Sequence, residues 1–159
     1  EDDMEKIITR SAQILKLPID KKSARAIAVR SRWTPRIANR ILKRAHDMFI
    51  VDSHTQIDGN LLDKLFRLLE IDEYGLTDVD LNYLKTIGVK FQNNAVGVET
   101  IASAMSEDKR TIEEFIEPYL LQMGFIKKTS RGRVLTSKAL KHLKVPQSKD
   151  SSASQQSLL

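Results

Sequence analysis

The stretch TIEEFIEPYLLQMGFIKKTSRGRVLT, residues 111–136, changes periodicity halfway and decides the fold of the second half of the chain. Apolar residues first recur at helical spacing, and they are Ile112, Phe115, Ile116, Tyr119, Leu120 and Met123. Gly124 ends this predicted helix, because helix C-termini favour glycine. Two short strands, 125–129 and 133–136, then flank a turn at Ser130-Arg131-Gly132, which predicts a β-hairpin.

Two more helices precede this stretch. Thr77 to Asp80 reads as a capping box, and the helix after it carries Leu81, Leu84, Ile87 and Phe91 on one face. A loop at Gln92-Asn93-Asn94 separates it from a short helix over 98–105, and a last helical turn carries Leu140 and Leu143. Three helices followed by a hairpin is the element order of a winged-helix domain.

The first half of the chain is helical throughout. Apolar residues at helical spacing predict helices near 7–15, 24–32 and 58–69. Thr34-Pro35 begins a fourth, because threonine is a good N-cap and proline suits the first helical position. We expect a mainly α fold in which a small helical domain, 1–72, is followed by a winged-helix domain, 73–145. The Ser/Gln-rich tail, 146–159, is expected to be disordered.

Composition excludes several classes of protein. The 159 residues contain no cysteine, which removes disulfides, thiolate zinc sites and cysteine nucleophiles. The six glycines are nowhere two or five positions apart, so neither a GxGxxG fingerprint nor a GxxxxGK phosphate loop exists. No apolar run approaches the ~20 residues of a membrane span. The chain opens on charged residues rather than a secretory signal, and without an initiator Met, so we expect it to be part of a longer cytosolic protein.

Charge is strongly segregated along the chain. Residues 21–46 hold nine Lys or Arg and no acid, and residues 118–149 hold eight and no acid. The segment 47–117 between them holds fifteen acids against six Lys or Arg. Either basic block alone is read most simply as a solvated face, but two of them in one small protein favour binding to a polyanion.

The predicted hairpin carries Lys127, Lys128, Arg131 and Arg133, and we expect no acid to pair with them. Such a ribbon is suited to neutralising the phosphates of a nucleic-acid backbone. Lys109 and Arg110 open the preceding helix and could share this face. No aromatic residue alternates with these cations, so we predict backbone contact without base reading. The alternative is a solvated hairpin whose charges only prevent strand pairing.

Other polar residues give weaker signals. Arg36 lies in the first turn of a helix, where a cation is unfavourable unless an anionic ligand is bound. An Arg36 that simply extends into solvent remains the alternative. His46, His54 and His142 have no metal-ligand spacing, so we expect no metal site and no catalytic residue in this chain. The acids Glu113, Glu114 and Glu117 are read as the solvated face of their helix.

Several motifs together resemble one family. Ser31 to Arg40, SRWTPRIANR, resembles the SRGTPRIANR segment of the RuvB family, the motors of Holliday-junction branch migration. Thr111 to Leu120 is similar to its TIEDVxEPYL segment, and Gly124 to Arg133 to its GFLxRTPRGR segment. Val96 to Thr100 is similar to its PVGxETLA segment, and the resemblance extends over 4–145.

The resemblance implies the lid and winged-helix parts of an AAA+ ATPase, without the large nucleotide-binding domain. It implies that Arg36 is the sensor-2 arginine reaching the phosphates of Mg-ATP, with Pro35 beside the nucleotide. It implies duplex DNA at Holliday junctions as partner, contacted at Lys109, Lys128 and Arg133. We add Arg131 to this DNA-binding set because it is a cation of the same hairpin. The resemblance further implies the partner RuvA, a homo-hexameric ring, a bacterial cytoplasm, and a role in recombination, repair and the SOS response. This chain alone is expected to be inactive as an ATPase.

Departures from the family pattern affect two turns and two cations. Trp33 stands where the family has glycine, and a positive φ there would strain it by ~1 kcal/mol or more. Asn93-Asn94-Ala95 replaces Gly-Gly-Pro, a milder change because asparagine tolerates left-handed backbone. At positions 109 and 128 lysine replaces a frequent arginine, which keeps charge and loses bidentate geometry. A free-standing winged-helix transcription regulator and a protein-interaction module remain alternative functions.

Overall fold

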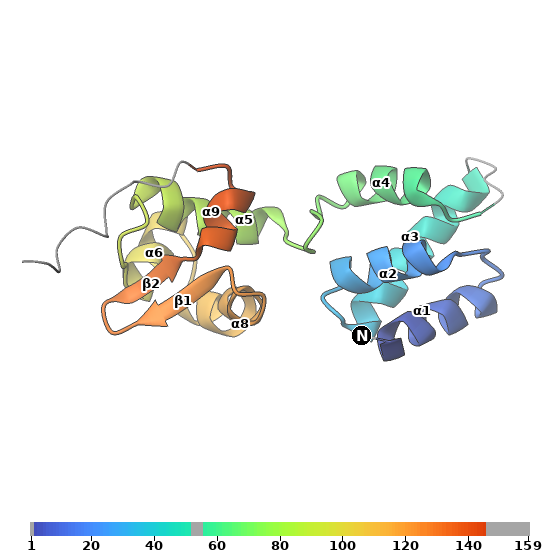
Figure 1. Ribbon diagram of the computed structural model, residues 1–159, viewed down its shortest axis with the longest axis horizontal. Coiled ribbons are helices and arrows are strands. Elements are labelled where there is room, and N and C mark those ends of the chain that lie inside the picture. Colours follow the sequence, from blue (N-terminus) through green and yellow to red (C-terminus); the bar gives the residue numbers. More distant parts are fainter. Residues whose placement is uncertain (1, 52–55, 146–159) are drawn as a thin grey trace, which may run out of the picture. The chain divides into compact units, whose positions relative to one another are not determined.

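The computed structural model describes residues 2–51 and 56–145, and the tail expected to be disordered, 146–159, lies outside these ranges. The chain divides into two compact units, 1–79 and 80–159 (Figure 1). The predicted fold class is confirmed, because helices make up most of the structure and one two-stranded hairpin accompanies them. No helix in the described part is both long and apolar enough to cross a membrane.

Residues 2–51 and 56–79 of the first unit form a bundle of four helices, as the sequence predicted. They are α1 Asp2–Ile14, α2 Lys21–Arg30, α3 Pro35–Val51 and α4 Gly59–Leu68. Their apolar faces meet in one core, whose fully buried members include Ile8, Ile27, Leu42 and Leu61. Asp20 and Asp58 cap α2 and α4, since their carboxylates accept the backbone N–H groups of Ser23 and Leu61 at 2.7 and 2.9 Å.

The turn between α2 and α3 uses left-handed backbone twice in succession. Arg32 has a φ of 53° and Trp33 a φ of 55°, so the condition for strain at Trp33 is met. The tryptophan side chain is partly buried against the bundle core, which offsets part of that strain. Arg32 Nε donates to the carbonyl of Gly75 at 2.8 Å and so ties this turn to the segment that leaves the bundle.

The second unit has the winged-helix order that the sequence predicted. Its helical elements are α5 Asp78–Lys85, η1 Thr86–Lys90, α6 Val98–Met105, α7 Lys109–Thr111, η2 Ile112–Ile116, α8 Glu117–Gln122 and α9 Ser137–His142. The strands β1 Ile126–Thr129 and β2 Gly132–Leu135 form the hairpin, which we call the wing together with its turn. Tyr83, Ile87, Leu120 and Phe125 are fully buried and form the centre of this unit.

The single helix predicted over 112–123 is interrupted. It consists of α7, the π-helical η2 and α8 in succession. Pro118 explains the interruption, because proline has no N–H to donate and its ring crowds the carbonyl four residues earlier. A π-helical turn ahead of the proline accommodates both defects without ending the helix. Glu117, directly before the proline, is thereby the first residue of α8.

The wing pairs with a third segment that sequence periodicity did not reveal. β1 and β2 are antiparallel, with Lys128 opposite Arg133. The backbone of Arg133 also pairs with Val96, donating to its carbonyl at 2.8 Å and accepting its N–H at 3.1 Å. Gly132 permits this approach, because its φ is 133° and a Cβ there would overlap the Val96 carbonyl oxygen.

Candidate nucleic-acid interface

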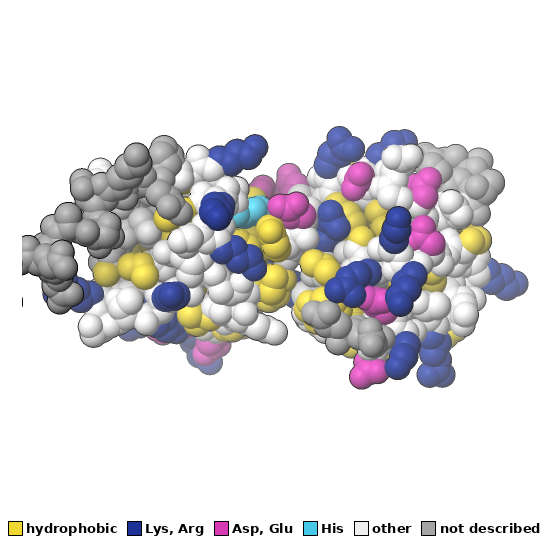
Figure 2. Space-filling view, viewed as in Figure 1, with side chains coloured by type: hydrophobic (Ala, Val, Ile, Leu, Met, Phe, Trp, Pro, Cys, Tyr) yellow, Lys and Arg dark blue, Asp and Glu magenta, His cyan; other side chains and the backbone are white. Residues whose placement is uncertain are grey.

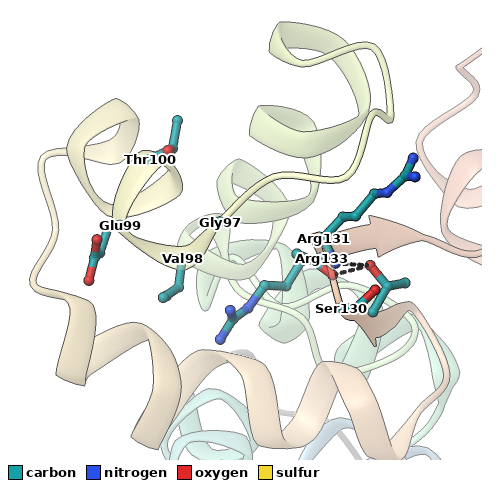
Figure 3. A pocket seen from close by; sticks show the side chains of 9 residues that line it. Gly97, Val98, Glu99, Thr100, Ser130, Arg131 and Arg133 are labelled. Carbon is teal, nitrogen blue, oxygen red and sulfur yellow. Dashed lines mark hydrogen bonds between the residues drawn. The ribbon is translucent and has the colours of Figure 1, made fainter.

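The four cations of the wing are not equivalent. Lys127, Lys128 and Arg131 are exposed, whereas only 14% of the Arg133 side chain is exposed. Figure 3 shows Arg131 and Arg133 leaving the hairpin in opposite directions. Across the described residues, neither Lys127 nor Arg131 forms a side-chain ion pair, so their charges are available to a ligand.

Glu117 lies beneath the wing with none of its surface exposed. Its Oε1 accepts from Tyr83 Oη at 2.8 Å and from Arg133 Nε at 2.6 Å. Its Oε2 accepts from Lys128 Nζ at 2.7 Å and from Arg133 Nη2 at 3.1 Å. Four donors therefore satisfy the roughly four acceptor positions that an ionised carboxylate offers.

The charge state of Glu117 follows from these contacts. Burial raises the pKa of a carboxyl, but hydrogen bonds from Arg133, Lys128 and Tyr83 outweigh burial and bring the pKa of Glu117 below its ordinary value. The pKa of Arg133 is raised, chiefly by its hydrogen bond to Glu117. Burial and the neighbouring carboxylate also raise the pKa of the Tyr83 phenol, which stays protonated. The site holds an ionised acid at neutral pH.

Two expectations from the sequence are wrong here. Glu117 was assigned to a solvated helix face and is fully buried. The wing was described as having no acid to pair with, yet Lys128 and Arg133 both bind Glu117, and Arg133 Nη2 also donates to Glu113 at 3.1 Å. The excess of cations on a hairpin that packs against a Glu-containing helix was the available signal for this pairing.

A shallow pocket of about 330 Å³ separates the wing turn from the start of α6 (Figure 3). Residues 97–100 form one wall and residues 129–133 the other. Lys109 lies at the edge of this region, donating to Glu99 at 2.9 Å, and both side chains are substantially exposed. Exposed ion pairs of this type contribute little to stability, so Lys109 can exchange Glu99 for another anion at small cost.

The second predicted site lies in the first unit, at the start of α3. Pro35 and Arg36 occupy the first two positions of this helix, and both are exposed. The first turn of α3 contains no acid, and among the described residues Arg36 has no ion-pair partner. Lys and Arg side chains are scattered over the visible surface of this unit (Figure 2). An anion can therefore approach Arg36 without displacing a protein carboxylate.

A four-helix unit joined to a winged helix with a basic wing has the make-up of an AAA lid followed by a DNA-binding domain. Two family models match in that order: the RuvB AAA lid domain over residues 1–72, and the RuvB C-terminal winged helix domain over residues 73–144. The chain belongs to the RuvB family, of which it carries these two domains.

Curated relatives and solved structures agree with this assignment. The "Holliday junction branch migration complex subunit RuvB" of Methanoregula boonei is 49% identical over 144 residues, which are 91% of this chain and 43% of the relative. The subunit of the same name from Orientia tsutsugamushi is 45% identical over 142 residues, 89% of this chain and 44% of the relative. The structure of the Thermotoga maritima RuvB Holliday junction branch migration motor has a TM-score of 0.85 and 41% identity, covering 91% of this chain and 49% of that one. The chain thus spans less than half the length of the relatives it matches.

Proposed function

We propose that this chain supplies the lid and the DNA-binding wing of an ATP-dependent motor that moves Holliday junctions along DNA. Membership of the RuvB family and the printed names of its relatives support this function. The structural observation that carries it is the wing itself, whose Lys127 and Arg131 are exposed cations without an ion pair in the described part of the chain. Such charges release counterions when they meet a phosphate backbone, which drives binding.

The contacts are proposed to be with duplex backbone, without base reading. Lys128 and Arg131 are the exposed members of the predicted set on the wing, and Lys109 binds Glu99, which lines the other wall of the pocket. Arg133 belongs to the same surface but has most of its side chain covered. The wing has no aromatic side chain on which a base could stack, which favours sequence-independent contact.

At the lid we propose that Arg36 contacts the phosphates of Mg-ATP, with Pro35 beside the nucleotide. The residues present fit one anionic contact and not a whole nucleotide site, since this sequence contains no phosphate loop. The free N–H groups at the start of α3 and an unpaired guanidinium suit a phosphate oxygen. By itself the chain is expected neither to hydrolyse ATP nor to bind it well.

The proposed setting follows the family resemblance. In the whole protein, subunits would form a homo-hexameric ring on duplex DNA and work with RuvA in the bacterial cytoplasm, in recombination, repair and the SOS response. One isolated wing offers few phosphate contacts, so the affinity of this chain should be weak without the ring.

Two other functions are less well supported. A transcription regulator would read bases with the helix from Thr111 to Met123, yet the exposed surface of η2 carries the acid Glu114, which repels DNA. A protein-interaction module would need no free cations on the wing. Family membership and the exposed Arg131 both favour the motor.

The proposal is tested by fluorescence anisotropy of a labelled duplex titrated with this chain over a series of salt concentrations. Weak binding whose log K falls with log salt is expected, and Arg131→Gln should reduce the slope by about 0.9, the value of one phosphate contact. Lys64→Gln on α4 is the matched control, because it removes the same charge from the lid. Equal effects of the two substitutions would indicate general attraction, and absence of binding at low salt would contradict a DNA-binding wing.

A further inference from the structure

We propose that Glu117 is a positioning residue for DNA binding: this buried acid holds Arg133 and Lys128 in place, so that removing a negative charge weakens binding to a polyanion. The inference rests on the proposed function of the wing. Glu117 acts indirectly, through the two cations of the wing that it binds.

The carboxylate of Glu117 joins parts of the unit that are far apart in sequence. Tyr83 of α5 is 34 residues away, and Arg133 of β2 is 16 residues away. With Lys128 of β1 included, one acid connects both strands of the wing to α8 and α5. Charge-assisted hydrogen bonds are roughly twice as strong as neutral ones, so this cluster attaches the wing firmly to the helices.

Arg133 is held in one orientation by two carboxylates. Its Nε and Nη2 both bind Glu117, and Nη2 also binds Glu113. Turning outward to a phosphate would leave a fully buried carboxylate without half of its donors, which is a large penalty in a site of low polarity. Its backbone also pairs with Val96 ahead of α6, so the same residue fixes the wall of the pocket.

The cluster is electrically balanced. Two cations, Lys128 and Arg133, face two carboxylates, Glu113 and Glu117. The net positive charge of the wing therefore comes from Lys127 and Arg131, which make no ion pair within the described residues. The contribution of the cluster to DNA binding is to fix where these free cations stand.

A positioning role and simple electrostatic attraction predict opposite changes in DNA affinity for Glu117→Gln. Glu117→Gln raises the net charge by one, so attraction alone would tighten DNA binding and steepen its salt dependence. A positioning role predicts weaker binding with a slope no steeper than that of the parent chain. Glu114→Gln is the matched control, because it removes an exposed acid from the same helical segment and frees its partner Arg110.

Tyr83→Phe separates positioning from charge altogether. Tyr83 is neutral and fully buried, so it cannot touch DNA, and its hydroxyl is one of the four donors to Glu117. Losing this hydrogen bond should weaken duplex binding by roughly 2- to 12-fold, the factor for a net hydrogen bond, at every salt concentration. The slope of log K against log salt should stay that of the parent chain.

The experiment is anisotropy with a labelled duplex at four salt concentrations, on the parent chain, Tyr83→Phe, Glu117→Gln and Glu114→Gln. Circular dichroism melts set the temperature well below unfolding for each variant. Weaker binding by Tyr83→Phe and Glu117→Gln, with Glu114→Gln equal to or tighter than the parent, is expected. Tighter binding by Glu117→Gln with a steeper slope, or an unchanged affinity in Tyr83→Phe, would overturn the positioning role while leaving DNA binding by the wing intact. A parent chain that does not bind duplex at all would overturn the proposed function and this inference together.

Discussion

The side-chain Oδ1 of Asn93 accepts the backbone N–H of Leu135 at 2.7 Å, so a residue between η1 and α6 closes the end of β2. Asn93 has a φ of 57°, the left-handed conformation that asparagine tolerates better than most residues. Asn93→Ala loses the acceptor and keeps a strained Cβ, and it should destabilise the winged-helix unit by about 2–3 kcal/mol. Asn93→Gly loses the same side-chain contacts to Leu135 without a strained Cβ, and it should be about 1 kcal/mol more stable than Asn93→Ala.

Urea denaturation followed through resolved amide signals of residues 80–145 measures both variants on the relevant unit. Equal stability of Asn93→Ala and Asn93→Gly would show that left-handed backbone at Asn93 costs nothing. The comparison isolates backbone strain, because both substitutions remove the same two hydrogen bonds between the Asn93 side chain and the backbone of Leu135.

Trp33 offers the same comparison in the lid. Its φ of 55° and its partial burial act against each other. Both Trp33→Ala and Trp33→Gly lose the packing of the indole, and only glycine also relieves the left-handed strain. We expect Trp33→Gly to be more stable than Trp33→Ala by about 1 kcal/mol. Chemical denaturation monitored by circular dichroism gives the difference, and the reverse order would refute strain in this turn.

Gly132 should tolerate no side chain. Its φ of 133° is unfavourable for an L-residue, and an added Cβ would overlap the Val96 carbonyl oxygen. Gly132→Ala is expected to destabilise the unit by about 2 kcal/mol or more, through backbone strain and a broken bridge between Val96 and Arg133. Gly97→Ala is the control from the same pocket, since Gly97 has no atom within 4 Å of an added Cβ. A thermal melt of both variants in which they lose stability equally would contradict the close approach at Gly132.

Glu117 should make the free energy of unfolding depend on pH. Burial raises the pKa of this carboxyl, but the hydrogen bonds from Arg133, Lys128 and Tyr83 lower the pKa by more than burial raises it. The folded pKa therefore lies below the unfolded value. The unfolded chain therefore takes up a proton first, at about pH 4.3, and favours unfolding as the solution becomes more acidic. The stabilisation is complete at neutral pH and is lost as the pH falls through the folded pKa.

Glu117→Gln is accordingly expected to lower the free energy of unfolding at pH 7 by about 3 kcal/mol, because Arg133 loses its main counter-charge. The difference in the free energy of unfolding between Glu117→Gln and the parent chain should become smaller as the pH is lowered toward 3. Urea titrations between pH 7 and pH 3 measure it, with Glu114→Gln as an exposed acid of the same helical segment. A difference that stays constant with pH would mean that Glu117 is not ionised in the folded protein.

The local sequence pattern was sufficient to predict the helices and strands, but it was not sufficient to predict the polar contacts between them. The apolar stripe from Ile112 to Leu120 places the second long helix of the winged-helix unit, and the turn glycine at 132 places the hairpin. Glu117 stands one position beyond the stripe residue Ile116, and its charge alone suggests exposure. Its burial depends on partners 34 and 16 residues away, which no local window of sequence contains.

Among the predicted site residues, the sequence likewise indicated which side chains are exposed, but it did not indicate which of them binds a buried acid. The sequence placed Arg36 at a helix start and Arg131 on the wing turn, and both side chains are exposed there. It did not separate Arg133 from its neighbours, because strand alternation does not show which cation meets a buried acid. The π-helical turn before Pro118 also escaped the helical pattern, since a bulge shifts the stripe by only one residue.

The hydrogen bond from Arg32 Nε to the carbonyl of Gly75 connects the turn before α3 directly to the segment that leaves the bundle. Arg32 lies four positions before Arg36, in the turn that starts α3, and Gly75 belongs to the segment that leaves the bundle. A Cβ at position 75 would lie 3.0 Å from the carbonyl oxygen of Arg30, so the segment is seated closely against the end of α2. A displacement of the turn at the start of α3 would therefore be passed to the outgoing segment through the side chain of Arg32. This route does not run through the apolar core of the bundle.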